Sequence, residues 1–253
     1  MDGYCLKPPI DPLLLSTVLI RTFNGETGLT NATGFLFARG GRLFLVTSGH
    51  VLFDEPSAHF PSHLTLELHT NAENLAEVAQ VRLPLYRNGL SLWRQATDDA
   101  GQVDVASLEL DRAALPPTAL YRPFSEQQLL DRGDAIEVGS SLLVIGYPLG
   151  FHDPLHRTPV ARHGIVASPF GLRFQGKGYF LVDARTHRGS SGAPVVMRAT
   201  GGHEADFPWI LLGVHSSRLD DGSRDAELDE ALGLNCAWYA DVLLSLTRPS
   251  WPC

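Results

Sequence analysis

The sequence predicts an all-β protein, folded as barrels or a sandwich, with one short helix near its C-terminus. Three observations point to this class. Many short β-rich runs are bounded by glycine, proline, asparagine or aspartate. Helical periodicity is weak except near the end of the chain. The 253 residues, 44% apolar and 19% charged, suffice for a sizeable core in one large all-β domain or two small subdomains.

The expected elements follow in chain order. The Gly40-Gly41 pair between two apolar runs predicts a hairpin turn. The proline-rich stretch Ala114–Pro123 predicts a seam between two halves, residues 1–115 and 116–253. Apolar residues at helical spacing predict a helix over residues 238–246, ended by Pro249, and the acidic stretch 220–230 is expected to be an exposed loop or short helix. The predicted strands are Leu14–Phe23, Thr33–Phe37, Arg42–Thr47, Leu64–Leu68, Val78–Leu83, Val105–Leu110, Ser141–Ile145, Gly178–Val182, Gly192–Val196 and Trp209–Val214.

Composition and charge restrict the partners. The net charge is −8, and no cluster of lysine and arginine stands out, so we expect no nucleic-acid partner. The same acidity disfavours anionic membranes. The histidines fall into no metal-ligand spacing; His59 and His63 are four residues apart, but Pro61 between them argues against a helix. We therefore expect neither a metal nor a cofactor.

The cysteines and the N-terminus favour the cytoplasm. The three cysteines, Cys5, Cys236 and Cys253, are odd in number and fit no zinc site. A chain that does not rely on disulfides favours a reducing compartment. The N-terminus lacks the basic start and apolar stretch of a secretory signal, and the apolar run 13–20 is too short to span a bilayer.

The strongest local signal is Gly189-Ser190-Ser191-Gly192-Ala193-Pro194. A nucleophilic serine needs an exposed Oγ on a tight turn, with backbone N–H groups aimed at the developing negative charge. Glycine two positions before the serine allows that backbone conformation, and glycine after it gives the next strand room. An ordinary glycine- and proline-rich turn is the alternative interpretation.

Two further segments carry a base and an acid. An apolar strand ends in small residues and then presents His50, and Asp104 opens another apolar strand. By itself the histidine is more often structural, and aspartate commonly bounds strands. The chain order His50, Asp104, Ser191 is nevertheless that of the chymotrypsin type of triad rather than of subtilisin or the α/β-hydrolases.

With these three motifs the sequence resembles the trypsin-like peptidases. Thr47-Ser48-Gly49-His50, Asp104-Val105-Ala106 and the turn around Ser191 are similar to the family's three motifs. Val144–Gly150 followed by His163–Val166 is similar to segments of the disulfide-poor bacterial branch, which includes HtrA-type proteases. The resemblance implies a chymotrypsin-like fold of two antiparallel six-stranded barrels, residues 1–115 and 116–253, with the helix in the second half. No PDZ-like domain is expected after it.

The resemblance also implies a role for each residue. Ser191 is expected to attack the peptide carbonyl, His50 to act as general base and then acid, and Asp104 to orient the imidazole. The N–H groups of Gly189 and Ser191 would form the oxyanion hole. Ser216 stands where the family has a serine that supports the triad acid, and it is also expected at the substrate-binding site.

Maturation is expected to differ from that of trypsin. Trypsin-type zymogens pair a new N-terminus with an aspartate just before the nucleophile, where this chain has the uncharged Ser190. Expression, loop ordering or a regulatory protein partner would then control activity.

The expected substrate is a protein or peptide cut after an acidic residue. Thr186 and His215 resemble the pair found in glutamyl endopeptidases, and a hydroxyl and an imidazole can both donate to a carboxylate or amide oxygen. Arg185 stands where enzymes that cut after basic residues carry an acid. If it faces the pocket, it attracts acidic side chains; the alternative is that it points to solvent. The sequence thus predicts cleavage after Glu, with Asp or Gln next.

A rival hypothesis is a catalytically silent or latent protease-fold binding module in a larger assembly. The complete set of triad motifs argues against it.

Overall fold

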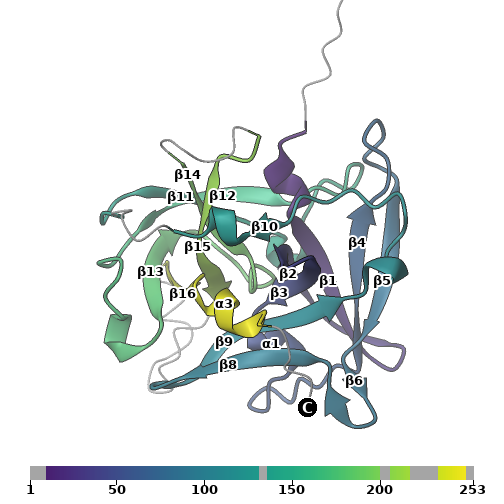
Figure 1. Cartoon of the computed structure of the whole chain (residues 1–253), viewed down its shortest axis with the longest axis horizontal. Coiled ribbons are helices and arrows are strands. Elements are labelled where there is room, and N and C mark those ends of the chain that lie inside the picture. The colour runs from purple at the N-terminus through teal and green to yellow at the C-terminus, as the bar shows by residue number, and fades with distance from the viewer. Residues whose placement is uncertain (1–9, 131–135, 200–205, 217–232, 249–253) are drawn as a thin grey trace, which may run out of the picture.

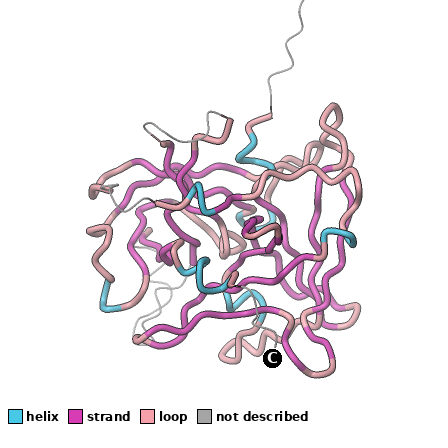
Figure 2. The backbone as a smooth tube through the Cα atoms, viewed as in Figure 1, coloured by secondary structure: helices cyan, strands magenta, loops and turns pink. Residues whose placement is uncertain are grey.

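The structure, a computed structural model, describes residues 10–130, 136–199, 206–216 and 233–248. Strands and loops make up nearly all of these residues, and the helical segments are short (Figure 2). The all-β class is therefore confirmed. The fold consists of a strongly curved sheet formed by the first half of the chain and a closed barrel formed by the second, which lie on the right and left of Figure 1.

The N-terminal sheet is eight-stranded, with the strand order β5-β4-β1-β2-β3-β9-β8, and β10 pairs in parallel with β2. Neighbours along the path are antiparallel. In the described residues no ladder joins β5 to β8, so this half is an open barrel rather than a closed six-stranded one. Its strands are β1 (Thr17–Asn24), β2 (Thr27–Arg39), β3 (Arg42–Thr47), β4 (His63–His69), β5 (Val78–Pro84), β8 (Trp93–Asp98), β9 (Gly101–Leu110) and β10 (Phe124–Ser125), and β6 (Tyr86–Arg87) pairs with β7 (Leu90–Ser91) apart from it.

The C-terminal half is a closed six-stranded antiparallel barrel with the strand order β11-β12-β13-β16-β15-β14, as predicted for this half. Its strands are β11 (Ser141–Gly146), β12 (Val160–Val166), β13 (Tyr179–Ala184), β14 (Pro194–Arg198), β15 (Trp209–Ser216) and β16 (Leu234–Tyr239).

The two halves share part of their hydrophobic core. All eight residues of β15 are buried, because alternate side chains face different apolar clusters. Ile210 and Leu212 pack inside the barrel, whereas Trp209 and Leu211 join Phe35 of the N-terminal sheet in a second cluster. This common cluster fixes β15 and its neighbours against the strands that carry the first half of the site.

Several predicted elements are confirmed, and others are corrected. The Gly40-Gly41 hairpin is confirmed: Arg39 pairs with Arg42, and both glycines have positive φ. The predicted strand 14–23 begins only at Thr17, because Pro12–Leu15 forms a 3-10 turn capped by Asp11. The strands β8, β12 and β16 lacked a clear apolar alternation, and the prediction missed them.

The predicted C-terminal helix starts later than expected. Trp238 and Tyr239 belong to β16 and pair with β13 and β15. Their rings point to opposite sides of the strand, Trp238 into the cluster shared with the N-terminal sheet and Tyr239 against the cluster inside the barrel, rather than along one face of a helix. The helix α3 (Val242–Leu246) lies in front of β8 and β9 (Figure 1), and Ser107 of β9 donates to its Leu246 carbonyl at 3.2 Å. The acidic stretch 220–230 lies outside the described residues.

Candidate active site

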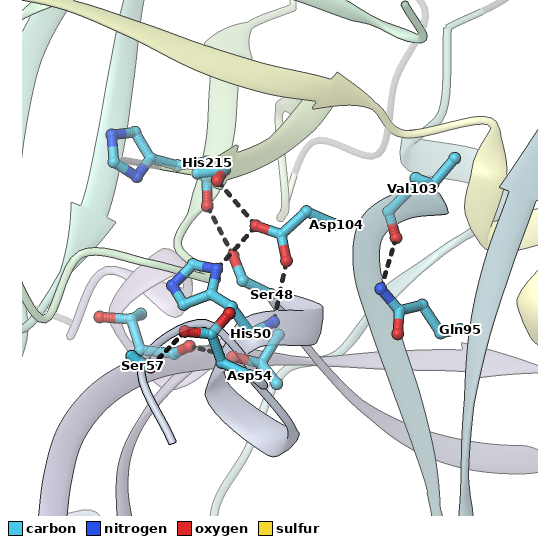
Figure 3. A network of polar contacts seen from close by, with 11 residues as sticks. Ser48, His50, Asp54, Ser57, Gln95, Val103, Asp104 and His215 are labelled. Atoms are coloured by element: carbon cyan, nitrogen blue, oxygen red, sulfur yellow. Dashed lines mark hydrogen bonds and ion pairs between the residues drawn. The ribbon is translucent and has the colours of Figure 1, made fainter. Parts of the chain in front are cut away.

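His50 and Asp104 are brought together by two neighbouring strands. β3 ends at Thr47, which pairs with Ala106 of β9, so the residues just beyond that pair face each other. The short helix α1 (Gly49–Leu52) then presents His50 to Asp104. Asp104 Oδ2 lies 2.7 Å from His50 Nδ1, and Oδ1 accepts the His50 backbone N–H at 2.9 Å (Figure 3). These two contacts fix both the imidazole and the backbone that carries it.

Asp104 is held as an anion. Burial alone would raise the pKa of Asp104, but hydrogen bonds and attraction from His50, with a further hydrogen bond from Ser216, bring that pKa below its ordinary value. Ser216 Oγ donates to Oδ2 at 2.8 Å. A carboxylate that accepts from Nδ1–H leaves Nε2 of neutral His50 as a hydrogen-bond acceptor, which is the state a general base requires.

Ser191 lies on the turn that leads into β14 and is buried, with 6% of its surface exposed. Thr33 N donates to the Ser191 carbonyl at 3.1 Å, and Gly192 N donates to the His215 carbonyl at 2.9 Å. A Cβ at Gly192 would lie only 2.2 Å from the Thr33 carbonyl oxygen. The turn therefore sits directly on the N-terminal sheet, at the strand end that precedes His50.

Residues 187–190 form the turn before Ser191. Ser190 N donates to the His187 carbonyl at 3.0 Å, and Gly189 has φ +90°, the pattern of a type II turn. The carbonyl of Arg188 accepts from Leu149 N at 2.5 Å. In a trans peptide the C=O and N–H point in opposite directions, so the Gly189 N–H points away from Leu149. An oxyanion hole needs this orientation.

His215 is fully buried and lies in a hydrogen-bonded network with Thr186 and Asn235. His215 Nε2 is 3.1 Å from Thr186 Oγ1, and Thr186 Oγ1 donates to Asn235 Oδ1 at 2.6 Å. Asn235 Nδ2 donates to the Ala184 carbonyl at 2.8 Å, which fixes the orientation of the amide. Thr186 therefore has its hydrogen on Asn235, and the hydrogen between His215 and Thr186 belongs to Nε2.

Burial keeps His215 neutral. Desolvation lowers the pKa of His215 to about 4, and this outweighs the hydrogen bonding from Asn235 and the backbone of Ser190. Nδ1 of His215 makes no hydrogen bond of normal geometry, although the Ser190 backbone is close enough to affect its pKa. Figure 3 shows the His215 ring pointing away from Asp104. His215 thus holds an uncharged N–H donor beside Thr186.

The remaining predicted pocket residue is Arg185, whose side chain is exposed at the surface after β13. Thr186 is half-buried. The structure therefore brings Thr186 and His215 into contact, and it brings Ser216 to Asp104 rather than to the pocket.

Sequence reasoning missed three contributors to the site. Asn235 orients Thr186 from β16, and the Leu149 backbone orients the Arg188 peptide. The third is Gln95 of β8, whose side chain packs so close to Gly49 that a Cβ there would lie 2.4 Å from its Nε2. Leu149 belongs to the segment that prompted the family resemblance, but its backbone contact had no signal in the sequence.

Metal-ligating residues are not grouped in the described ranges: no three His, Cys, Asp or Glu side chains there come together in a way that could hold an ion. Cys236 is buried, and Cys5 and Cys253 lie outside the described residues. Within the same ranges the longest α-helix, α3, has five residues, so none could traverse a bilayer.

The first half of the fold is an open β-barrel that carries the histidine–aspartate pair, and it packs on a closed barrel that carries the serine turn. This arrangement defines the class of proteins with the chymotrypsin-like fold. Comparison of the sequence with protein families agrees: the trypsin-like peptidase domain matches residues 32–202, and the chain belongs to this family. No curated protein sequence matches it. Among solved structures, the serine endoprotease from Yersinia pestis is similar, with a TM-score of 0.54 and 14% identity. The similarity covers 92% of this chain and 62% of that one, so this chain spans less than two thirds of its length.

Proposed function

We propose that this protein is a serine endopeptidase that uses Ser191 as nucleophile, His50 as general base and acid, and Asp104 as the orienting anion. The observation that carries the proposal is the double contact of Asp104 with the Nδ1 and the backbone N–H of His50. A carboxylate bound only to stabilise the fold has no need to fix one imidazole tautomer. The rival hypothesis, a catalytically silent binding module, also does not require the Gly189 N–H to have a particular orientation.

The reaction proceeds through an acyl-enzyme. His50 Nε2 takes the proton of Ser191 Oγ as Oγ bonds to the peptide carbonyl carbon, and the carbonyl oxygen becomes negatively charged. The N–H groups of Gly189 and Ser191 donate to that oxygen. His50 then gives its proton to the leaving amine as the C–N bond breaks, and water repeats the sequence to release the acid. Each oxyanion donor in comparable sites contributes about 3–4 kcal/mol.

We further propose cleavage after Glu, with Asp or Gln next. Support comes from the donors His215 Nε2–H and Thr186 Oγ1–H, which lie together beside the nucleophile turn. In the unbound protein these hydrogens are donated to Thr186 Oγ1 and Asn235 Oδ1. A carboxylate or amide oxygen of the substrate would replace one of these acceptors, whereas a basic side chain brings only donors. Because His215 is uncharged, its N–H distinguishes only weakly between the carboxylate of Glu and the amide of Gln. Gln should therefore compete with Glu for the site better than Lys does. Arg185, exposed near the pocket, adds positive potential that favours the acid.

The proposal includes a reducing, cytoplasmic compartment of a bacterial cell and control by a regulatory protein partner. The odd number of cysteines, three in the chain, is compatible with a reducing compartment. The protein should then keep full activity in the presence of a thiol reductant; loss of activity on reduction would contradict this part.

A fluorophosphonate probe tests the chemistry directly. The wild type should be labelled at Ser191, and Ser191→Ala should lose both labelling and turnover, with kcat reduced about 10⁴-fold or more. Unchanged circular dichroism and melting temperature of the variant would show that the fold is intact. Equal turnover by the variant would end the serine-peptidase proposal. A peptide library digested by the wild type then reports specificity, and cleavage after Arg, Lys or Val would refute the acidic pocket alone.

A further inference from the structure

The loop 148–157, which connects β11 to β12, exposes large apolar side chains beside the nucleophile turn. The most exposed large hydrophobic residues of the described chain are Leu90 (73%), Leu149 (70%), Phe151 (67%), Leu172 (67%) and Leu155 (61%). Single exposed residues of this kind are ordinary on protein surfaces. Three of these five, Leu149, Phe151 and Leu155, lie within seven residues of one loop, and we call them the loop patch.

The start of this loop is tied to the nucleophile turn. Leu149 N donates to the Arg188 carbonyl at 2.5 Å, and Gly150 packs against Asn31 of β2, where a Cβ would lie 2.9 Å from Asn31 Nδ2. Leu149 holds φ +55°, which is unfavourable for a branched side chain. A residue kept in this conformation is held there by its surroundings, so the backbone that carries the exposed side chain is fixed.

The end of the loop is tied to the N-terminal sheet. His69 Nε2 of β4 lies 2.7 Å from the His156 carbonyl, and Arg157 Nη1 lies 3.5 Å from Glu67 Oε2 of the same strand. Glu67 is buried, with 7% of its side chain exposed, so its charge is not freely solvated. The loop patch is therefore presented on a segment anchored to both halves of the fold.

The loop lies where we expect the residues after the cut bond of a bound peptide to pass. On the acyl side of the cut bond, the side chain enters the pocket of Thr186 and His215 in the C-terminal barrel. The leaving amine must reach His50 Nε2, on the N-terminal sheet. Residues after the cut bond then pass the N-terminal sheet near β2, where the loop contacts Asn31.

We propose that the loop patch binds apolar side chains on the leaving side of the cut bond, so that this peptidase prefers substrates with Leu, Ile, Val or Phe within the first few residues after the cut. The inference rests on the proposed peptidase function and adds a second determinant of specificity. Burial of one exposed apolar side chain against another removes both from water and favours binding. A loop whose backbone is anchored at both ends loses little backbone freedom when the peptide docks.

The test compares two peptides that share the acyl side and differ after the cut, one with Leu and the other with Ser at the first two positions. The wild type should cleave the Leu peptide with a kcat/KM about tenfold higher. In Phe151→Ser combined with Leu155→Ser this ratio should fall toward one, and it should stay unchanged in Leu90→Ser, a residue of the β6–β7 hairpin with matched exposure. A ratio unchanged by the double substitution would overturn the inference.

Two controls separate this inference from the proposed function. A chromogenic ester with the same acyl part has no amino acid after the cut, so the double variant should hydrolyse it at the wild-type rate; a parallel loss would mean a general structural role and refute the inference. Binding of both peptides to the Ser191→Ala protein, measured by fluorescence polarisation, needs no turnover. There the Leu peptide should bind more tightly only when Phe151 and Leu155 are present, and equal affinities would refute the inference even if no turnover occurred.

Discussion

The amide N–H of Leu149 donates to the carbonyl of Arg188 at 2.5 Å, across 39 residues of sequence. Because the Arg188–Gly189 peptide is trans, this bond decides which way the Gly189 N–H points. A loop that carries no predicted catalytic residue thus sets the geometry of one proposed oxyanion donor. Leu149 is a positioning residue, and it acts through its backbone.

Replacing Leu149 by proline should impair catalysis more than binding. Proline lacks the N–H and its ring cannot adopt the positive φ of Leu149, so the Arg188–Gly189 peptide loses the contact that orients it, and kcat should fall about 10²-fold or more while KM changes little. Leu149→Gly is the matched control, because it keeps the N–H and accepts φ +55°. Steady-state kinetics on one peptide would measure both. If Leu149→Pro kept kcat within about threefold of the wild type, the positioning role would be refuted.

His215→Ala should reduce discrimination rather than chemistry. Removal of the Nε2–H donor leaves a cavity and frees Thr186, so kcat/KM for a Glu peptide should fall by about 10- to 100-fold relative to an otherwise identical Ala peptide. Because His215 is neutral at pH 7, the ratio between Glu and Gln peptides should change much less. A uniform loss on all peptides would indicate a structural role for His215 alone.

The buried neutral state of His215 should make folding stability depend on pH. Its pKa is about 4 in the folded protein, against an ordinary value of 6.5. Between these values the unfolded chain binds a proton that the folded chain does not, so stability is complete above pH 6.5 and is lost as pH falls toward 4. The free energy of unfolding should decrease by at most about 3 kcal/mol over this pH range.

Urea unfolding of the wild type and of His215→Gln at about pH 7.5 and about pH 4.5 isolates this effect. Other groups titrate in both proteins and cancel in the difference. Asp104 does not interfere, because its lowered pKa moves its own contribution below this window. The stability gap between the two proteins should shrink at the lower pH; a constant gap would contradict the assignment.

Two glycines with nearly equal φ should respond differently to alanine. Gly192 (φ +84°) would place a Cβ 2.2 Å from the Thr33 carbonyl and from Thr47 Oγ1, whereas Gly171 (φ +85°) has open space there. Gly171→Ala should cost about 1–2 kcal/mol from the backbone conformation alone. Gly192→Ala should cost several kcal/mol more, because the nucleophile turn must move off the N-terminal sheet. Thermal unfolding of both variants measures this, and equal losses would mean that the turn tolerates displacement.

The sequence by itself determined the all-β class and most of the strands, because period-two apolar runs between turn residues need no long-range information. It also marked the segments that carry His50, Asp104 and Ser191, since a tight serine turn requires glycine at fixed offsets. The prediction from sequence failed where the same spacing of apolar residues fits both a helix and a strand. Trp238 and Tyr239 matched an apolar helical face, but they form the end of β16.

Tertiary structure alone decided how the site is oriented. The contact of Leu149 with Arg188 uses backbone atoms that every residue has, so no side-chain pattern could announce it. The link from Asn235 through Thr186 to His215 joins three different parts of the chain, and it makes Nε2 the donor. The charge of His215 depends on desolvation by strands that close the barrel around it. Local composition determines which groups are available, whereas their direction and protonation depend on neighbours that only the folded chain brings near.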